Sequence, residues 1–252
     1  MIENKKYKNN YLKLVIFRID FSPLLNLAKE ILNPNLQKDF IAINFKDLTE
    51  HKLVEFETKF ERGVKTDKFK SISLWKFIDN EKHHQVSICE NYLIIENLKY
   101  LGYDNYKDIV MQIFNIFSKY YEPNINRFGL RYINEINLET GNPFDWSDYI
   151  NESLIFSLNN FFGSKQSDLC RYFGRYEMNK DDFMLTMQYG IVNSIFPNKI
   201  AKKEFVLDYD CHTKDVENKD ELYKKLDLFH NEINYFFEKS ITNGLRKKMG
   251  EI

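Results

Sequence analysis

Residues 124–138 combine the alternation of a β-strand with charged and amide side chains. Because successive side chains point to opposite faces of a strand, Arg127 and Arg131 share one face with Glu135. Asn134 lies on the other face, among apolar residues. Two guanidinium groups on one strand face can bracket an anionic ligand, or they can pair with carboxylates on neighbouring strands.

The same segment therefore has two interpretations. At a rise of ~3.3 Å per residue, Arg127 and Arg131 are about 13 Å apart along the strand. A buried arginine needs a carboxylate partner, and Asp20 and Asp208 are the candidates because they lie on other strands that we expect to be central. Arg127, Arg131, Asn134 and Asp20 thus form either a ligand-binding site or a structural polar network. An arginine that meets a carboxylate in the core would indicate the network.

A second group of polar residues, Asp208, Asp210 and His212, occupies every second position of a predicted strand. Two carboxylates and an imidazole on one strand face could hold a divalent cation. A metal-dependent hydrolase would use such an ion to activate water. No HxH or HD motif supports the set, so a solvated or salt-bridged strand face is the alternative.

Other sequence signatures of enzymes are absent. The chain contains no GxGxxG, GxxxxGK[ST] or GxSxG motif. Its three cysteines, Cys89, Cys170 and Cys211, fit neither a zinc-binding spacing nor a disulfide framework, so we expect them to act as small core residues. We expect no cofactor, and we favour a protein that is not an enzyme.

The composition limits the partners. The formal net charge of -1 provides no general attraction for nucleic acid or anionic lipid, so nucleic-acid binding is not expected. The 22 Phe and 16 Tyr indicate a core built on rings, or rings kept for a binding surface. The polar N-terminus lacks a signal-peptide pattern and no apolar run has membrane-spanning length, which predicts a cytoplasmic protein without a membrane partner.

The elements that position these residues follow from periodicity and from turn signals. We interpret Asn33-Pro34-Asn35 as a helix break. The predicted order indicates an α+β fold with antiparallel sheets packed against long amphipathic helices. It suggests two similar halves, residues 1–140 and 141–252, or one continuous domain. The predicted strands are 11–21, 52–62, 69–78, 85–96 (as two short strands), 124–138, 168–178, 183–192 and 203–212, and the predicted helices are 22–32, 106–120, 146–162 and 220–239.

Four places in the chain resemble a sporadically distributed family of uncharacterised bacterial proteins of similar length. They are Leu74-Trp75-Lys76-Phe77 with the hairpin at 86–95, Tyr106, the strand at 127–136, and residues 205–210 with the C-terminal helix. The most specific motif is Gly129-Leu130-Arg131-Tyr132-Ile133-Asn134. The resemblance implies a scattered, mobile-element-like distribution and no established activity, so it transfers no catalytic residue.

Three functions from different classes remain. The preferred one is a non-enzymatic interaction or regulatory module, antitoxin-, immunity- or chaperone-like, that binds a protein partner or further copies of itself through an aromatic-rich surface. Such a module would fit a bacterial defence or toxin–antitoxin system. The first alternative is a small-ligand-binding protein with a cavity between sheet and helix, closed by Arg127 or Arg131. The second is a metal-dependent hydrolase that uses Asp208, Asp210 and His212.

Overall fold

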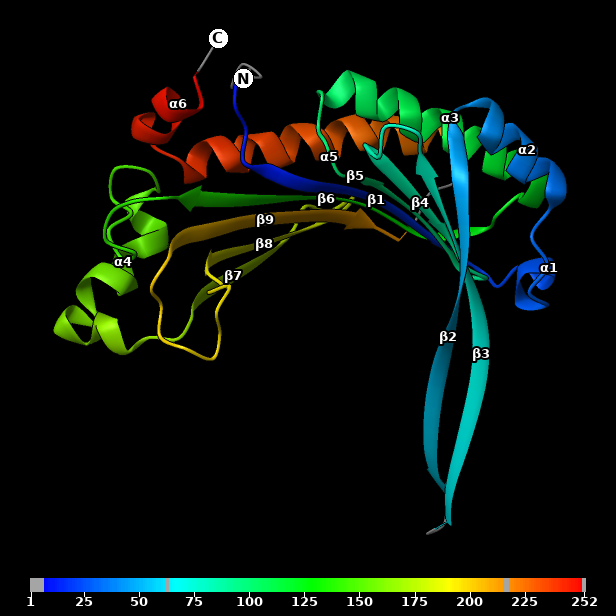
Figure 1. Ribbon diagram of the computed structural model, residues 1–252, viewed down its shortest axis with the longest axis horizontal. Helices are drawn as coiled ribbons and strands as arrows, with labels where there is room; N and C mark the ends of the chain where they lie inside the picture. Colours follow the sequence, from blue (N-terminus) through cyan, green and yellow to red (C-terminus); the bar gives the residue numbers. More distant parts are fainter. Residues whose placement is uncertain (1–6, 62–63, 215–217, 251–252) are drawn as a thin grey trace. The chain divides into compact units, whose positions relative to one another are not determined.

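The computed structural model of the protein describes residues 7–61, 64–214 and 218–250. Over these residues the protein is an α+β fold with a nine-stranded antiparallel sheet (Figure 1). The strand order across the sheet is β2-β3-β4-β5-β1-β6-β9-β8-β7. The strands are β1 (Leu12–Phe21), β2 (Phe45–Glu61), β3 (Val64–Asp79), β4 (His84–Ile88), β5 (Tyr92–Asn97), β6 (Ile125–Leu138), β7 (Tyr172–Asn179), β8 (Met184–Ile191) and β9 (Lys203–Thr213).

Alpha-helices and one 3-10 helix lie between these strands or follow the last of them. The predicted α+β class is therefore confirmed, and the segment at 85–96 does split into two strands, as expected. The helices are α1 (Leu25–Ala28), α2 (Pro34–Ala42), α3 (Tyr103–Tyr121), α4 (Glu152–Asn160), η1 (Gly163–Asp168), α5 (Lys219–Ser240) and α6 (Asn243–Met249).

Contacts along the backbone divide the chain into two compact units. Strands β1 and β6 contribute residues to both, so the division falls inside strands and differs from the predicted boundary at 140/141. The first unit comprises Met1–Val15, Gly129–Thr213 and Lys219–Ile252, and the second comprises Ile16–Phe128 and Lys214–Asn218.

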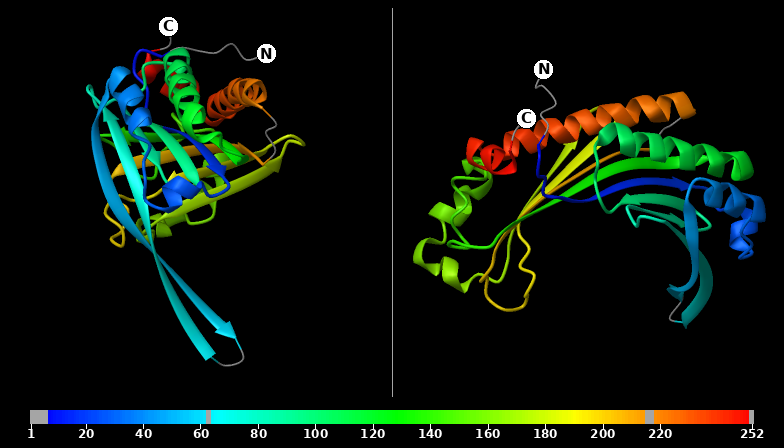
Figure 2. Two further views of the ribbon diagram at one scale, coloured as in Figure 1. Left: turned by 90° about the vertical axis from the view of Figure 1, so that its right-hand side faces the viewer. Right: turned by 45° about the horizontal axis from the view of Figure 1, so that its top comes forward.

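Aromatic rings fill the core of the second unit, where α3 packs on β1 and β5 (Figure 2). The fully buried Tyr106 donates a hydrogen bond from its hydroxyl to the Ile95 carbonyl, at 2.7 Å. The rings of Phe21 and Phe117 have centroids 5.4 Å apart. Ring pairs at this separation add to the free energy gained from burying their area, so these rings hold α3 on the sheet.

In the first unit, α5 packs against the sheet through both apolar and polar contacts. The rings of Phe183 and Phe229 lie 5.0 Å apart. Buried Tyr209 donates a hydrogen bond to the hydroxyl of Ser240 at 2.8 Å. Because a buried hydroxyl needs a partner, this bond fixes the end of α5 over β9.

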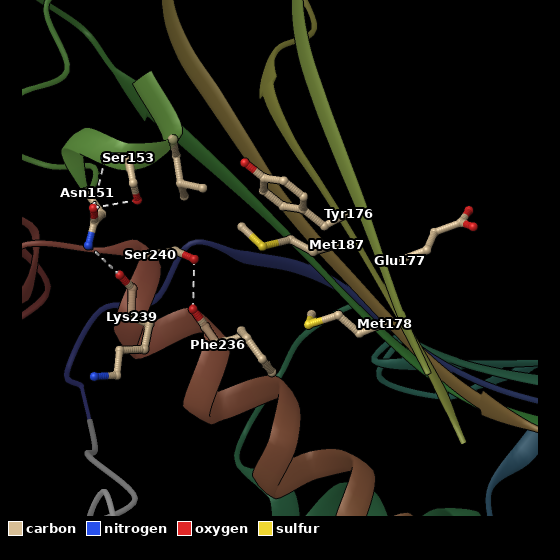
Figure 3. A pocket seen from close by; sticks show the side chains of 10 residues that line it. Asn151, Ser153, Tyr176, Glu177, Met178, Met187, Phe236, Lys239 and Ser240 are labelled. Atoms are coloured by element: carbon tan, nitrogen blue, oxygen red, sulfur yellow. Dashed lines mark hydrogen bonds between the residues drawn. The ribbon is translucent and has the colours of Figure 1, made fainter. Parts of the chain in front are cut away.

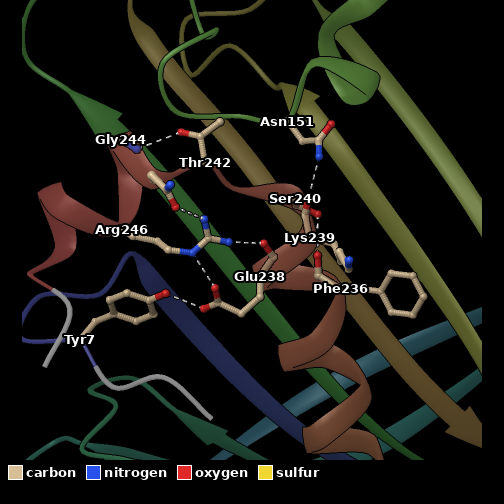
Figure 4. Close-up of polar contacts among 10 residues, drawn as sticks. Tyr7, Asn151, Phe236, Glu238, Lys239, Ser240, Thr242, Gly244 and Arg246 are labelled. Carbon is tan, nitrogen blue, oxygen red and sulfur yellow. Dashed lines mark hydrogen bonds and ion pairs between the residues drawn. The ribbon is translucent and has the colours of Figure 1, made fainter. Parts of the chain in front are cut away.

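The C-terminal helix is held by an ion pair inside the same unit (Figure 4). Glu238 of α5 is buried, and its Oε2 accepts a hydrogen bond of 2.8 Å from Nε of Arg246 in α6. Its Oε1 accepts a second bond, of 2.5 Å, from the Tyr7 hydroxyl. Both carboxylate oxygens are thus satisfied, which permits the burial of the charge.

Two predicted helices have different bounds in the structure. Asn33-Pro34-Asn35 begins α2, because the Asn33 side chain accepts a hydrogen bond from the Asn35 amide at 2.9 Å and Pro34 fits the first turn. The preceding helix does end before Asn33, although it is shorter than predicted and comprises only α1, and the new helix that begins at Pro34 was not predicted. The helix predicted from 146 begins at Glu152, since Trp146 is a buried residue of the preceding turn.

The hairpin of β2 and β3 is longer than predicted. The two strands pair from Phe45↔Asp79 to Glu61↔Val64, whereas β4 pairs with β3 only at residues 75–78. Among the described residues, 51–61 and 64–74 therefore form a two-stranded ribbon that no third strand joins; we call this ribbon the arm (Figure 1). The strand predicted at 69–78 is longer at its start, because β3 already begins at Val64.

A substitution at one glycine of β8 can test how closely β7 and β8 approach each other. Gly190 has φ +138°, and an ideal Cβ there would lie 2.0 Å from the Tyr172 carbonyl oxygen. Gly190→Ala is expected to lower the free energy of unfolding in urea by at least about 2 kcal/mol. The control is Gly163→Ala, at φ +50° with no described atom within 4 Å, for which we expect about 1 kcal/mol. Equal losses would contradict the close approach.

Candidate functional site

The arginine of the signature motif binds a carboxylate. Arg131 donates from Nε to Oδ1 of Asp208 at 2.8 Å and from Nη2 to Oδ2 at 2.5 Å. Asp208 is buried, while the Arg131 side chain is 40% exposed. The hydrogen bonds with Asp208 raise the pKa of Arg131 further above its ordinary value. Arg131 therefore has the predicted carboxylate partner and joins β6 to β9 as part of the scaffold.

Asn134 makes the second polar link between the same two strands. It is buried on the opposite face of β6, and its Nδ2 donates a hydrogen bond of 3.2 Å to the Leu207 carbonyl. A buried amide without such a partner would cost free energy, so this bond explains how the core tolerates the residue. Asn134 thus belongs to the structural network, as the second interpretation required.

Arg127 and Asp20 meet in the second unit, with a further arginine that sequence reasoning left out. Arg18 donates from Nε and Nη2 to Oδ1 of Asp20, at 2.9 and 2.6 Å, and Arg127 Nη1 lies 3.5 Å from Oδ2. The Arg18 guanidinium also lies 4.9 Å from the ring centroid of Tyr92. The available signal was the spacing of Arg18 and Asp20, two residues apart on one strand face.

The phenol in this cluster is not suited to act as a base. Burial raises the pKa of Tyr92 to about 12, and the neighbouring Cys89 adds to the effect. The hydroxyl therefore stays protonated at neutral pH. In this cluster Tyr92 contributes its ring, which lies against the Arg18 guanidinium, and a hydroxyl that stays neutral.

The predicted metal ligands do not form one cluster. Asp208, Asp210 and His212 lie opposite successive alternate residues of β8, so they are spread along β9. Alternate residues of a strand are roughly 6.6 Å apart, which makes a shared ion hard to reach, and Asp208 already binds Arg131. Among the described residues, no three His, Cys, Asp or Glu side chains come close enough to hold a metal ion.

The cysteines are free thiols. Cys89 and Cys211 are buried and Cys170 is partly buried. Burial raises the pKa of Cys211 above its ordinary value, with the Asp210 carboxylate adding to the effect. The thiolate needed by a nucleophile is thus disfavoured at Cys211.

An open cleft of about 440 Å³ lies in the first unit, where the start of α4 and the end of α5 face β7 and β8 (Figure 3). Neither Arg127 nor Arg131 lines it, so the ligand cavity predicted behind an arginine is not this cleft. Its apolar walls consist of Leu154, Tyr176, Met178, Met187 and Phe236, and its polar residues are Asn151, Ser153, Glu177, Lys239 and Ser240.

Most polar groups of the cleft already have partners. Asn151 caps α4 by accepting a hydrogen bond from the Ser153 amide at 3.0 Å, and it donates to the Lys239 carbonyl at 3.0 Å (Figure 3). Ser240 donates to the Phe236 carbonyl at 2.7 Å. The Lys239 ammonium differs, because within the described part of the chain it forms no ion pair. Among the described residues, Lys239 is therefore the one cation of the cleft that can pair with an acidic ligand.

The arm carries an exposed apolar face. Residues directly opposite on antiparallel strands share a face, so the register places Val54, Phe56 and Phe69 together. Their exposed fractions are 68%, 57% and 72%, and the two phenyl centroids are 5.0 Å apart. This face was missed because alternation predicts strands without showing which hairpin lacks a third strand.

The base of the arm is anchored on both faces. On one face Ser73 is buried, accepting a hydrogen bond from Lys52 at 2.7 Å and donating one to Glu50 at 2.8 Å. On the other face Ile72 and Leu74 are buried with Cys89. The arm is thus fixed where it leaves the sheet, and its apolar face begins only beyond this anchor.

Comparison with known proteins adds no identification. No protein-family model matches the chain, and no curated protein matches it. The resemblance to an uncharacterised bacterial family accordingly remains a prediction. In the described part of the chain, no helix is both long enough and apolar enough to cross a membrane.

The Arg131–Asp208 pair can be tested as a structural unit. Arg131→Met is expected to lower the free energy of unfolding in urea by roughly 1–2 kcal/mol, less than for fully buried pairs because Arg131 is 40% exposed. Arg131→Met combined with Asp208→Leu should recover much of the loss, since no buried carboxylate is then unpaired. Lys199→Met, which breaks the exposed pair with Asp168, is the control and should change little. A double variant as unstable as the sum of both single variants would contradict the pairing.

Proposed function

We propose that the protein is a non-enzymatic interaction module that binds a protein partner through the arm. The observation that supports this most directly is the exposed face of Val54, Phe56 and Phe69 on a two-stranded ribbon. Such a ribbon is marginally stable by itself in water, and clustered exposed apolar side chains are typical of binding surfaces. A partner that covers this face would stabilise it.

The charges of the arm favour a protein as this partner. Residues 50–72 contain six Lys or Arg and five Asp or Glu. Nucleic acids and anionic membranes bind to surfaces with a clear positive excess, which this segment lacks. A regulatory, antitoxin-, immunity- or chaperone-like role in a bacterial defence or toxin–antitoxin system is consistent with such a surface. The three free cysteines fit a reducing cytoplasm as the place of action.

We also propose that the scaffold consists of two similar halves, each with antiparallel strands packed against a long amphipathic helix. Helices α3 and α5 support this because their principal buried residues follow the same spacing of four, three and four positions. This spacing keeps one helix face toward the sheet. The residues are Tyr106, Val110, Ile113 and Phe117 in α3, and Leu222, Leu226, Phe229 and Ile233 in α5.

Site-specific photo-crosslinking in cells tests the interaction. A benzophenone amino acid at Phe56 or Phe69 is expected to give one discrete protein adduct. The matched control is the same amino acid at Phe161, an aromatic position that is 80% exposed and lies outside the arm. Adducts that are missing at the arm, or that are identical at Phe161, would contradict the proposal.

A further inference from the structure

We infer that the partner of the arm is a second copy of this chain, whose open cleft receives Phe56 and Phe69. This inference rests on the proposed function of the arm and adds the identity of the partner. Three properties of the described residues support it: the area that the arm can bury, the chemistry of the cleft walls, and the charges beside each surface.

The area that the arm can bury argues against a symmetric contact between two arms. If the arms of two copies packed face to face, Val54, Phe56 and Phe69 would bury roughly 700 Å² in total, below the ~1,200 Å² of a stable interface. A second arm is therefore too small a partner for the arm, and a different surface of the second copy must receive the rings.

The cleft matches the rings in size and in chemistry. Its volume of about 440 Å³ lies within the ~300–1,000 Å³ of pockets that hold small molecules, so it can accept two phenyl rings 5.0 Å apart. Met178 and Met187 lie on its wall (Figure 3). Thioether groups adapt to aromatic rings and make favourable contacts with them.

The charges beside the two surfaces are complementary. Asp67 precedes Phe69 by two residues and shares its strand face. Among the described residues, its carboxylate pairs with the exposed Lys65 and accepts a hydrogen bond from the Thr58 hydroxyl. An exposed pair of this kind is weak and can be exchanged. Lys239 at the cleft has no acidic partner among the described residues. Asp67 of one copy and Lys239 of another can therefore pair when the rings enter the cleft.

The contact joins two different surfaces. Each copy has one arm and one cleft, so the interface is heterologous, and repetition of the contact gives a ring or an open chain. This property separates it from a symmetric arm-to-arm contact, in which each copy would contribute the same residues.

A complementation experiment can test this contact, because an arm variant and a cleft variant damage different surfaces. Phe56→Ser/Phe69→Ser removes the arm face, and Met178→Glu places a carboxylate in the cleft; circular dichroism and thermal unfolding verify that both full-length variants fold. Sedimentation velocity is expected to show association of the wild type, monomers for each variant alone, and a 1:1 dimer without larger species for their equimolar mixture. A wild type that is monomeric at all concentrations, or a mixture that does not recombine, would overturn the inference.

A charge reversal tests the pairing of Asp67 with Lys239. Lys239→Glu should raise the dissociation constant of self-association at least tenfold, and adding Asp67→Lys should restore it. Lys199→Glu, at an exposed lysine outside the cleft, is the control and should leave it unchanged. Failure of the restoration would remove this pair from the interface.

The two proposals fail separately. If the wild type is monomeric but the crosslinker at Phe69 captures a different protein, the second copy is excluded and the interaction module stands. If the crosslinker captures nothing and no self-association occurs, both proposals fall.

Discussion

A strand can share its backbone hydrogen bonds only as far as its neighbour extends, and this limit leaves the arm as a two-stranded ribbon. Strand β3 has 16 residues, whereas the adjacent β4 has five. The hairpin beyond β4 therefore has only two strands, and beyond its buried base one of its faces carries the exposed Phe56 and Phe69. The mismatch in strand length thus leaves a strand edge of the hairpin unpaired beyond β4.

The charged residues of β6 are used inside the sheet. Arg131 binds the buried Asp208 through two hydrogen bonds, Asn134 bonds the Leu207 carbonyl, and Arg127 shares Asp20 with Arg18. Each contact satisfies a polar group that would otherwise be costly at that depth. The most distinctive motif of the chain therefore belongs to the scaffold, while the arm and the cleft consist of residues without any motif.

The arm and the cleft differ in form: the arm carries exposed rings, whereas the cleft is a hollow. The arm presents rings that its own fold leaves exposed, and the cleft presents methionine, leucine and aromatic walls that are open to solvent. One surface lies on a two-stranded ribbon and the other is hollow, and in the proposed contact the Asp67 carboxylate beside the first pairs with the Lys239 ammonium beside the second. Self-association through these two surfaces would bury exposed apolar groups of both, and the hydrophobic effect supplies the driving force.

The sequence by itself determined the strands and the long helices, because alternation and helical periodicity are local properties. It also indicated Asp208, together with Asp20, as a candidate partner for the arginines of this strand, since a buried arginine needs a carboxylate. The helix that begins at Pro34 was missed because proline favours both a helix break and a first helical turn. Only the tertiary structure decided that β3 extends beyond β4 and that residues of α4, α5, β7 and β8 line an open cleft. Those features depend on which segments become neighbours, and neighbours distant in sequence leave no local pattern.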